Sequence, residues 1–381
     1  MLLMAKFSLK DALFNRKKVA YLAALIKAAY PEFKERKFTQ QILQQFPNLA
    51  LKQRISCIRK HLEKHLPNEF EAALNIILLS LPDELDAAKT DGDFGDYIFA
   101  PLADFIAANG LENRHLNLSL NALAKITKRF SAEDSIRYFI NQYPQQTFAF
   151  MQTISRSKNY HQRRLASEGL RPKLPWSISI DFDYQKSIQI LDELYFDNTR
   201  FVVRSVANHL NDIAKFDADL VIKTLQKWHL ENKQINQKEM DFLTRHALRT
   251  LVKQGNIPAL KLLGYQANPA IFVSDFKLNN KQIYLGDYLQ FSFQITSKIL
   301  QKTQNLMLDY KIIYPSKGKK ISAKVFKIKK IILQENESVL IKKKHLFKAM
   351  TTKKLHFGNY QIHLQINGEI FAKQSFCLRF L

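Results

Sequence analysis

The chain is short of the residues that mark several protein classes. Two cysteines, Cys57 and Cys377, stand at opposite ends, which excludes a disulfide framework and makes a reducing cytoplasm the expected compartment. Only 10 glycines and 11 prolines occur in 381 residues, so collagen-like and low-complexity chains are excluded. No apolar run reaches the ~18–20 residues of a membrane span, and the opening apolar stretch is too short for a secretory signal. We therefore expect a soluble chain with no membrane partner.

Acidic residues are scarce relative to basic ones. The chain has 58 Lys and Arg against 34 Asp and Glu, so its formal net charge is +24. This excess favours a polyanionic partner. The length indicates about two domains, and the 46% of hydrophobic residues is enough to fill their cores.

Apolar residues recur at helical spacing from Ser8 to about Gly264. Short breaks rich in Pro, Asn and Asp separate these runs, which predicts a chain of successive helices. Three of the predicted helices share a repeat of 41 residues. Arg204 follows Arg163 by 41 residues and Arg245 follows Arg204 by 41, and each arginine precedes small or apolar residues at i+3 and i+6. A period near 40 is typical of HEAT-type helical hairpins, which stack into a solenoid.

The three repeated arginines have two interpretations. Equivalent helices form one wall of such a solenoid, so the arginines would make a basic row along it. Alternatively, they brace neighbouring repeats through buried Asp contacts. The sequence leaves both open.

Near Ile271 the period changes from helical to alternating. About seven alternating segments follow, and Asn367-Gly368 is a strong two-residue hairpin signal. This pattern predicts a small immunoglobulin-like sandwich. The expected fold class is mainly α with an all-β second domain: a HEAT-like α-solenoid over residues 1–266, then a basic β-sandwich over 267–381.

The predicted sandwich is the more basic part. Residues 271–381 hold 20 Lys and Arg and 6 Asp and Glu. A lysine-rich hairpin over 317–330 includes Lys327 and Lys329, which share a face opposite Phe326 and Ile328. Lysines of this kind suit sequence-independent phosphate binding. They also suit an edge strand that is protected against aggregation.

Motifs for several chemistries are absent. The chain has no phosphate-binding G-x-x-x-x-G-K-[ST] or G-x-G-x-x-G, which disfavours nucleotide hydrolases and Rossmann enzymes. Cys57, His61 and His65 are four residues apart, but no second Cys or His cluster completes a zinc site. We interpret them as the polar face of an amphipathic helix. No metal and no cofactor are expected.

Three other side chains stand at helix ends or breaks. Glu133 begins a predicted helix two residues after Ser131, a plausible N-cap. Trp176 follows a proline-interrupted segment, and Asp212 closes a repeat helix. By themselves these features are compatible with a helix-dipole contact, core packing and an inter-repeat contact, respectively.

Five longer strings are unusual enough to be compared with known families: DGDFGDYIFAP (91–101), ITKRFSAEDSIRYF (126–139), RRLASEGLRPKLPW (163–176), VRSVANHLNDIAK (203–215) and RHALRTLVKQG (245–255). At these strings the chain resembles the HEAT-repeat DNA alkylation repair glycosylases, and within them the AlkC type, which also carries a C-terminal immunoglobulin-like domain. The resemblance covers nearly the whole chain. The chain departs from the AlkC pattern at Asp134-Ser135, where an apolar pair is usual.

The resemblance implies hydrolysis of the N-glycosidic bond of cationic alkylated bases in double-stranded DNA, with 3-methyladenine first and 3-methylcytosine second. It implies Glu133 and Asp212 as catalytic carboxylates and Trp176 as the aromatic beside the lesion. We expect a monomer in the bacterial cytoplasm, associated with the nucleoid. The expected DNA-binding residues are Arg163, Arg164, Arg171, Arg204, Arg245, Arg249, Lys327 and Lys329.

A cationic base suits these residue types. It leaves as a neutral base and needs no general acid, while a fixed carboxylate stabilises the oxocarbenium character of the deoxyribose and holds the attacking water. An indole adds a cation–π attraction. No matched motif offers a Schiff-base lysine, so a monofunctional glycosylase is expected.

The alternatives are a non-catalytic HEAT-repeat scaffold that binds nucleic acid by charge, and a solenoid that binds an acidic protein.

Overall fold

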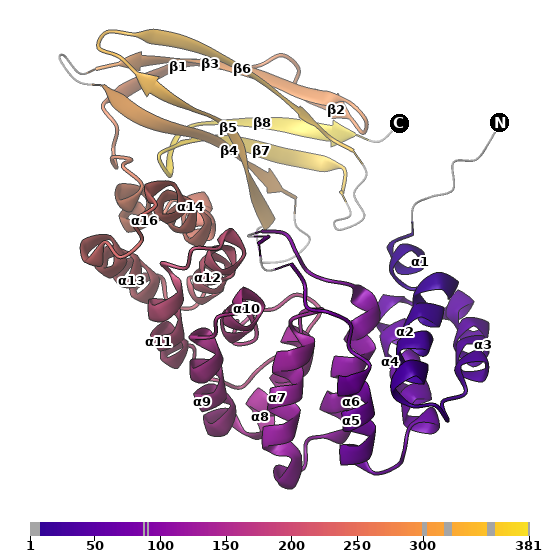
Figure 1. Ribbon diagram of the computed structural model, residues 1–381. Coiled ribbons are helices and arrows are strands. Elements are labelled where there is room, and N and C mark those ends of the chain that lie inside the picture. Colours follow the sequence, from indigo (N-terminus) through magenta and orange to yellow (C-terminus); the bar gives the residue numbers. More distant parts are fainter. Residues whose placement is uncertain are drawn as a thin grey trace. The chain divides into compact units, whose positions relative to one another are not determined.

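The computed structural model describes residues 8–86, 88–89, 91–298, 303–315, 322–348 and 355–379. Its contacts divide the chain into two compact units, Met1–Ala247 and Leu248–Leu381. The first is helical, and the second contains the sheets together with two short helices (Figure 1). The predicted fold class is confirmed: a stack of helices is followed by a β-sandwich.

The first unit consists of consecutive helices joined by short connections. Polar caps start several of them, because a side-chain oxygen satisfies a free N–H of the first turn; Asn15, Asn159 and Asp217 do so for α2, α10 and α13. The α-helices are α1 (Leu9–Leu13), α2 (Arg16–Ala29), α3 (Glu35–Gln45), α4 (Leu51–His65), α5 (Phe70–Leu79), α6 (Ala100–Asn109), α7 (Leu116–Ile126), α8 (Glu133–Gln142), α9 (Pro144–Ser155), α10 (Tyr160–Glu168), α11 (Tyr184–Leu194), α12 (Arg200–Ile213), α13 (Ala218–Glu231) and α14 (Gln237–Ala247). Short 3-10 turns occupy η1 (Phe46–Asn48), η2 (Tyr97–Phe99) and η3 (Asn113–His115).

These helices form two layers. In one layer α4 packs on α6 and α6 on α8, while α10 packs on α12 and α12 on α14. In the other, α5, α7, α9 and α11 contact one another in chain order (Figure 1). The 41-residue repeat corresponds to α10, α12 and α14, each the second helix of a pair. Apolar stripes meet between the layers and leave Leu165, Val206 and Leu243 without exposure.

The α4 turn that carries Cys57 and His61 was interpreted as a polar surface, and this interpretation is wrong. Both side chains are buried. Gln45 contacts the Nε2 of His61 at 3.0 Å and lies 3.6 Å from the Cys57 sulfur, so one side chain of α3 contacts both buried residues of α4. Burial lowers the pKa of His61.

The second unit begins with α15 (Arg249–Gln254) and α16 (Ile257–Leu262) and continues as two sheets. The predicted boundary at 266/267 falls between α16 and β1, whereas the compact unit starts at Leu248. Eight strands are described, where about seven were expected. They are β1 (Ile271–Leu278), β2 (Gln282–Tyr284), β3 (Tyr288–Ser297), β4 (Gln304–Tyr314), β5 (Ser322–Leu333), β6 (Ser338–Leu346), β7 (Gly358–Ile366) and β8 (Glu369–Arg379).

The sheets have the orders β1-β3-β6 and β2-β8-β7-β4-β5. Inward residues such as Phe293, Ile312 and Ile362 fill the core between them. The predicted hairpin joins β7 to β8: Ile366 pairs with Glu369, and Asn367 and Gly368 have φ of 46° and 87°. Two consecutive left-handed residues give the twist that a two-residue hairpin needs.

The lysine face of β5 is confirmed. Lys327 and Lys329 are exposed, whereas Phe326 and Ile328 pack against the core. Since β5 is an edge of its sheet, the edge-protection interpretation fits its position. Lys317, Lys319 and Lys320 of the same predicted hairpin lie outside the described residues.

Among the helices in the described ranges, none has the length and apolarity to cross a bilayer.

Two glycines of the segment before η2 differ in their surroundings and provide a matched test. Both have left-handed φ, 74° at Gly92 and 77° at Gly95. A Cβ on Gly95 would lie 1.8 Å from the Arg129 carbonyl oxygen, whereas one on Gly92 meets nothing within 4 Å. We expect Gly92→Ala to cost about 1 kcal/mol and Gly95→Ala about 3 kcal/mol, because the backbone must also move. Denaturant unfolding followed by circular dichroism measures both, and equal losses would contradict this account.

Candidate active site

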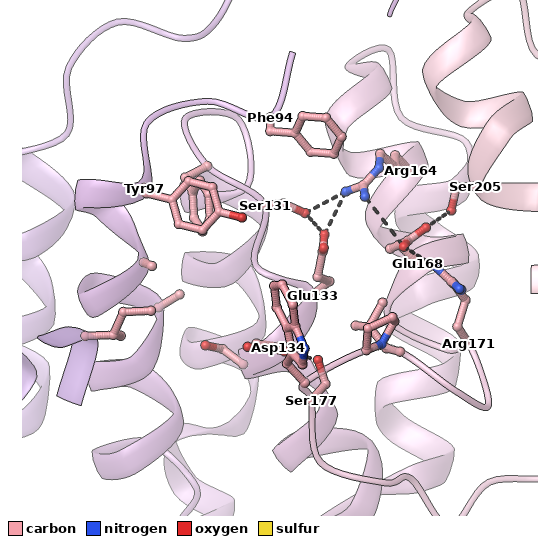
Figure 2. A pocket seen from close by; sticks show the side chains of 18 of the residues that line it. Phe94, Tyr97, Ser131, Glu133, Asp134, Arg164, Glu168, Arg171, Ser177 and Ser205 are labelled. Atoms are coloured by element: carbon pink, nitrogen blue, oxygen red, sulfur yellow. Dashed lines mark hydrogen bonds and ion pairs between the residues drawn. The ribbon is translucent and has the colours of Figure 1, made fainter. Parts of the chain in front are cut away.

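A cavity of about 360 Å³ opens in the helical unit between α4, η2, α8, α10, α12 and the loop of residues 169–183. Its wall combines carboxylates, arginines and aromatic rings (Figure 2). Glu133 and Trp176, two of the residues predicted to be catalytic, both line it, and so do Arg164, Arg171 and Arg204. Asp212 is not among the lining residues.

Glu133 is the first residue of α8, at the positive end of the helix dipole. Its carboxylate accepts a hydrogen bond from Arg164 at 2.7 Å and another from the Ser131 hydroxyl. The side chain keeps 24% of its surface exposed, so it is fixed and still open to the cavity. The prediction that Ser131 caps α8 is wrong: Ala132 stands at the cap position, and Ser131 instead holds Glu133.

Arg164 is an internal brace. Its guanidinium lies 4.4 Å from the Phe201 ring centre and 5.5 Å from that of Phe94, and it contacts Glu133 and Glu168 (Figure 2). Burial by itself would lower the pKa of Arg164, but the two carboxylates outweigh it and raise the pKa. Because the side chain is buried and paired on both sides, its predicted phosphate contact is not supported.

Arg171 continues the same chain of charges. It donates to Glu168 at 2.5 Å and, through Nε, to Asp212 at 2.9 Å. Ser205 also donates to Glu168 at 2.6 Å. Burial would raise the pKa of Glu168, yet Arg164 and Arg171 lower it. Arg171 is thus committed to two internal carboxylates.

Asp212, the other predicted catalytic carboxylate, lies at the inner end of this chain and not on the cavity wall. Only 3% of its side chain is exposed, and Arg171 and Lys215 engage its two oxygens at 2.8 and 2.7 Å. It sits near the end of α12, one turn before Lys215. Its two oxygens are therefore engaged by cations within the fold.

The remaining predicted DNA-binding arginines fall in different places. Arg163 binds the buried Asp197 at 2.5 Å and so braces α10 against the start of α12, as the bracing interpretation expected. Arg204 lines the cavity and pairs with Asp91. Arg245 is half exposed, 3.9 Å from Asp241, and Arg249 begins α15 in the other unit. Arg163, Arg204 and Arg245 therefore differ in their partners and in their exposure.

Trp176 has an unusual backbone and an unusual exposure. Its φ is 65°, in the left-handed region that bulky residues avoid, and 79% of its surface is accessible. A large apolar side chain at a cavity mouth, held in a costly conformation, is typical of a functional position.

Sequence reasoning missed Arg137, one turn after Glu133 on α8. It is buried and donates to the carbonyls of Ile178, Gly169 and Arg171 at 2.7, 3.0 and 2.8 Å. Burial lowers the pKa of Arg137 to about 10. These bonds clamp both ends of the loop that carries Trp176. No sequence signal identified it, since its partners are backbone atoms 32–41 residues away.

Four further residues line the cavity that the sequence did not identify as part of the site: Lys52, Phe94, Tyr97 and Asp134. Phe94 packs edge-on against Phe201 at 5.0 Å. Burial, and then the nearby Glu133, raise the pKa of Tyr97. Phe94 and Tyr97 belong to the string 91–101, so that match was the available signal. No three His, Cys, Asp or Glu side chains in the described part of the chain are arranged to hold a metal ion.

Comparison with known proteins decides the family. The solved structure of the Pseudomonas fluorescens alkylpurine DNA glycosylase AlkC, bound to DNA containing an abasic site analog, superposes with a TM-score of 0.85. It is 32% identical, and the match covers 98% of this chain and 100% of that one. The chain belongs to the AlkC family.

Two further matches agree with this assignment. The uncharacterized protein YhaZ of Bacillus subtilis (strain 168) is 31% identical over 362 residues, 94% of this chain and 96% of that protein. Residues 272–380 match the family described as the uncharacterised protein YhaZ, C-terminal Ig-like domain. The predicted immunoglobulin-like sandwich of this AlkC family member is thereby confirmed.

The position of Asp212 leads to a stability prediction. We expect Asp212→Asn to lower the free energy of unfolding by about 3 kcal/mol, because it leaves Arg171 buried with a weakened partner. Asp241→Asn removes the same charge from an exposed, distant pair and should change stability by less than about 0.5 kcal/mol. Denaturant melts of both variants measure the difference. Similar values would show that the Asp212 pair is not a buried brace.

The left-handed φ of Trp176 leads to a second stability prediction. Trp176→Gly and Trp176→Ala both remove the exposed indole, but only glycine adopts this φ without strain. We expect the glycine variant to be more stable than the alanine variant by about 1 kcal/mol. Thermal and denaturant unfolding of the pair provide the measurement, and an alanine variant of equal or higher stability would rule out the strain.

Proposed function

We propose that this protein is an alkylpurine DNA glycosylase that hydrolyses the N-glycosidic bond of cationic N-alkylated bases. Membership of the AlkC family supports the reaction class. The observation that carries the proposal is the state of Glu133: a carboxylate fixed by Arg164 and Ser131, open to a cavity whose mouth carries the exposed indole of Trp176.

Glu133 supplies what the reaction needs. When a base is alkylated to a cation, it departs as a neutral molecule, so the positive charge that develops is on the deoxyribose. A carboxylate held in place by Arg164 stabilises that charge without having to reorganise, and it also orients the water that captures the sugar. Glu133 does this without Asp212, which Arg171 and Lys215 neutralise inside the fold.

Trp176 gives selectivity for charged bases. An indole face attracts a cation by about 0.5–2 kcal/mol, whereas a neutral base gains only stacking. In our proposal 3-methyladenine is the first substrate and 3-methylcytosine the second. Both carry the charge that the indole and the carboxylate recognise.

The cavity supports a monofunctional reaction. The lysine among its described lining residues is Lys52, whose Nζ contacts the Asp134 carboxylate at 3.0 Å and the Trp176 carbonyl. A Schiff-base nucleophile needs an amine free to attack the sugar carbon. We therefore propose release of the free base with an abasic site left in an intact strand.

Duplex DNA is the proposed partner. The net charge of +24 suits a phosphate backbone, and the AlkC structure with which this chain superposes holds DNA. The exposed Lys327 and Lys329 on β5 are the proposed phosphate contacts outside the helical unit. In the helical unit the proposed phosphate contact is Arg204, because it is a partly exposed arginine at the cavity wall.

The decisive experiment is base release from methylated duplex DNA. We expect Glu133→Gln to slow the release of 3-methyladenine, measured by chromatography under single-turnover conditions, by about 100-fold or more. Glu112→Gln is the matched control, since Glu112 is an exposed partner of Arg114 outside the cavity, and it should release base at the wild-type rate.

Two outcomes would contradict the proposal. Equal rates for Glu133→Gln and wild type would remove Glu133 from the chemistry. DNA binding without any base release by the wild type would favour a non-catalytic scaffold that binds nucleic acid by charge.

A further inference from the structure

The Trp176 indole needs a device that holds it, and packing does not supply one. With 79% of its surface exposed, the side chain has few neighbours to fix its rotamer. The φ of 65° is also unfavourable for a tryptophan and persists only where the surroundings impose it. Contacts to the backbone around Trp176 must therefore determine where the indole stands.

Two charged side chains make these contacts at the cavity rim. Lys52, on the first turn of α4, donates to the carbonyl oxygen of Trp176 and pairs with Asp134 at 3.0 Å. Asp134, next to Glu133 on α8, accepts through its other oxygen from the hydroxyl of Ser177. The three elements α4, α8 and the loop are thus joined at Trp176 and Ser177, where Figure 2 shows Asp134 and Ser177 in contact.

Lys52 and Asp134 contact a loop whose fold other residues already hold. Arg137 clamps the loop from the buried side, and Asn141 binds Ser179 and Asp181 beyond it, at 3.0 Å each. Lys52 and Asp134 are both 52% exposed, and exposed pairs add little to stability. Removing them should therefore free Trp176 without unfolding the loop.

We propose that Lys52 and Asp134 are positioning residues that orient the Trp176 indole over the cavity for a cationic base. The proposal rests on the function proposed above and adds this pair to the site. Asp134 also places a second negative charge on the cavity wall, 1 residue from Glu133, where it favours a cationic ligand. Lys52 balances this charge while it holds the Trp176 carbonyl.

Tryptophan fluorescence tests the positioning directly. The chain has two tryptophans, and the other, Trp228, is buried and stacked on Tyr195 at 4.4 Å. Fast, local depolarisation in time-resolved anisotropy therefore reports Trp176, and a Trp176→Phe protein gives the background. We expect Lys52→Met and Asp134→Asn each to increase this fast component at least twofold. Arg114→Met, from an exposed pair outside the cavity, should leave it unchanged.

Kinetics on methylated duplex DNA test the consequence. We expect about a tenfold lower single-turnover rate of base release for either variant, with melting temperatures equal to that of Arg114→Met. The double variant should lose no more than the larger single loss, because both residues act through one indole. A purely structural role would instead lower the melting temperature and leave the anisotropy of the folded protein unaltered.

Each outcome decides between the claims. Unchanged anisotropy in both variants overturns the positioning role, whatever the activity. If the variants have a mobile indole but release base at the wild-type rate, a fixed indole is not important for the reaction. A wild-type protein that releases no base defeats the proposed function, while the anisotropy still decides the positioning claim.

Discussion

Buried charges must be paired, and this constraint organises the site. Glu133, Arg164, Glu168, Arg171 and Asp212 form a chain of alternating charge that runs from the cavity into the helical unit. Each interior member has partners on both sides, and Lys215 completes the inner end. An isolated buried carboxylate or guanidinium would be costly, but the alternation satisfies all of them. The outer end of the chain is the carboxylate that remains open.

The same chain fixes α8, α10 and α12 relative to one another around the cavity. Glu133 belongs to α8, Arg164 and Glu168 to α10, and Asp212 to α12. The aromatic rings of Phe94 and Phe201 cover Arg164 and keep water from its guanidinium. A site built on rigid helices holds its carboxylate more precisely than a loop would.

The loop of residues 169–183 adds a costly backbone conformation, the left-handed φ of Trp176. Strain of this kind persists where surrounding bonds over-determine the backbone. Arg137 provides such bonds on the buried side, and Lys52 and Asp134 provide them at the rim. Rigid helices therefore fix the carboxylate, and a braced loop presents the indole.

The sequence by itself determined the elements of this protein. Helical spacing, the 41-residue repeat, the change to alternation near Ile271 and the Asn367-Gly368 turn are local patterns, and local backbone preferences act over a few residues. Resemblance then pointed to Glu133 and Trp176, which the structure brings to one cavity. Only the tertiary structure decided that Asp212 turns inward, that Arg163, Arg164 and Arg171 brace the fold, and that Lys52, Asp134 and Arg137 surround the tryptophan. These contacts join residues up to 124 positions apart, and which of several like charges faces a cavity depends on partners that no local pattern specifies.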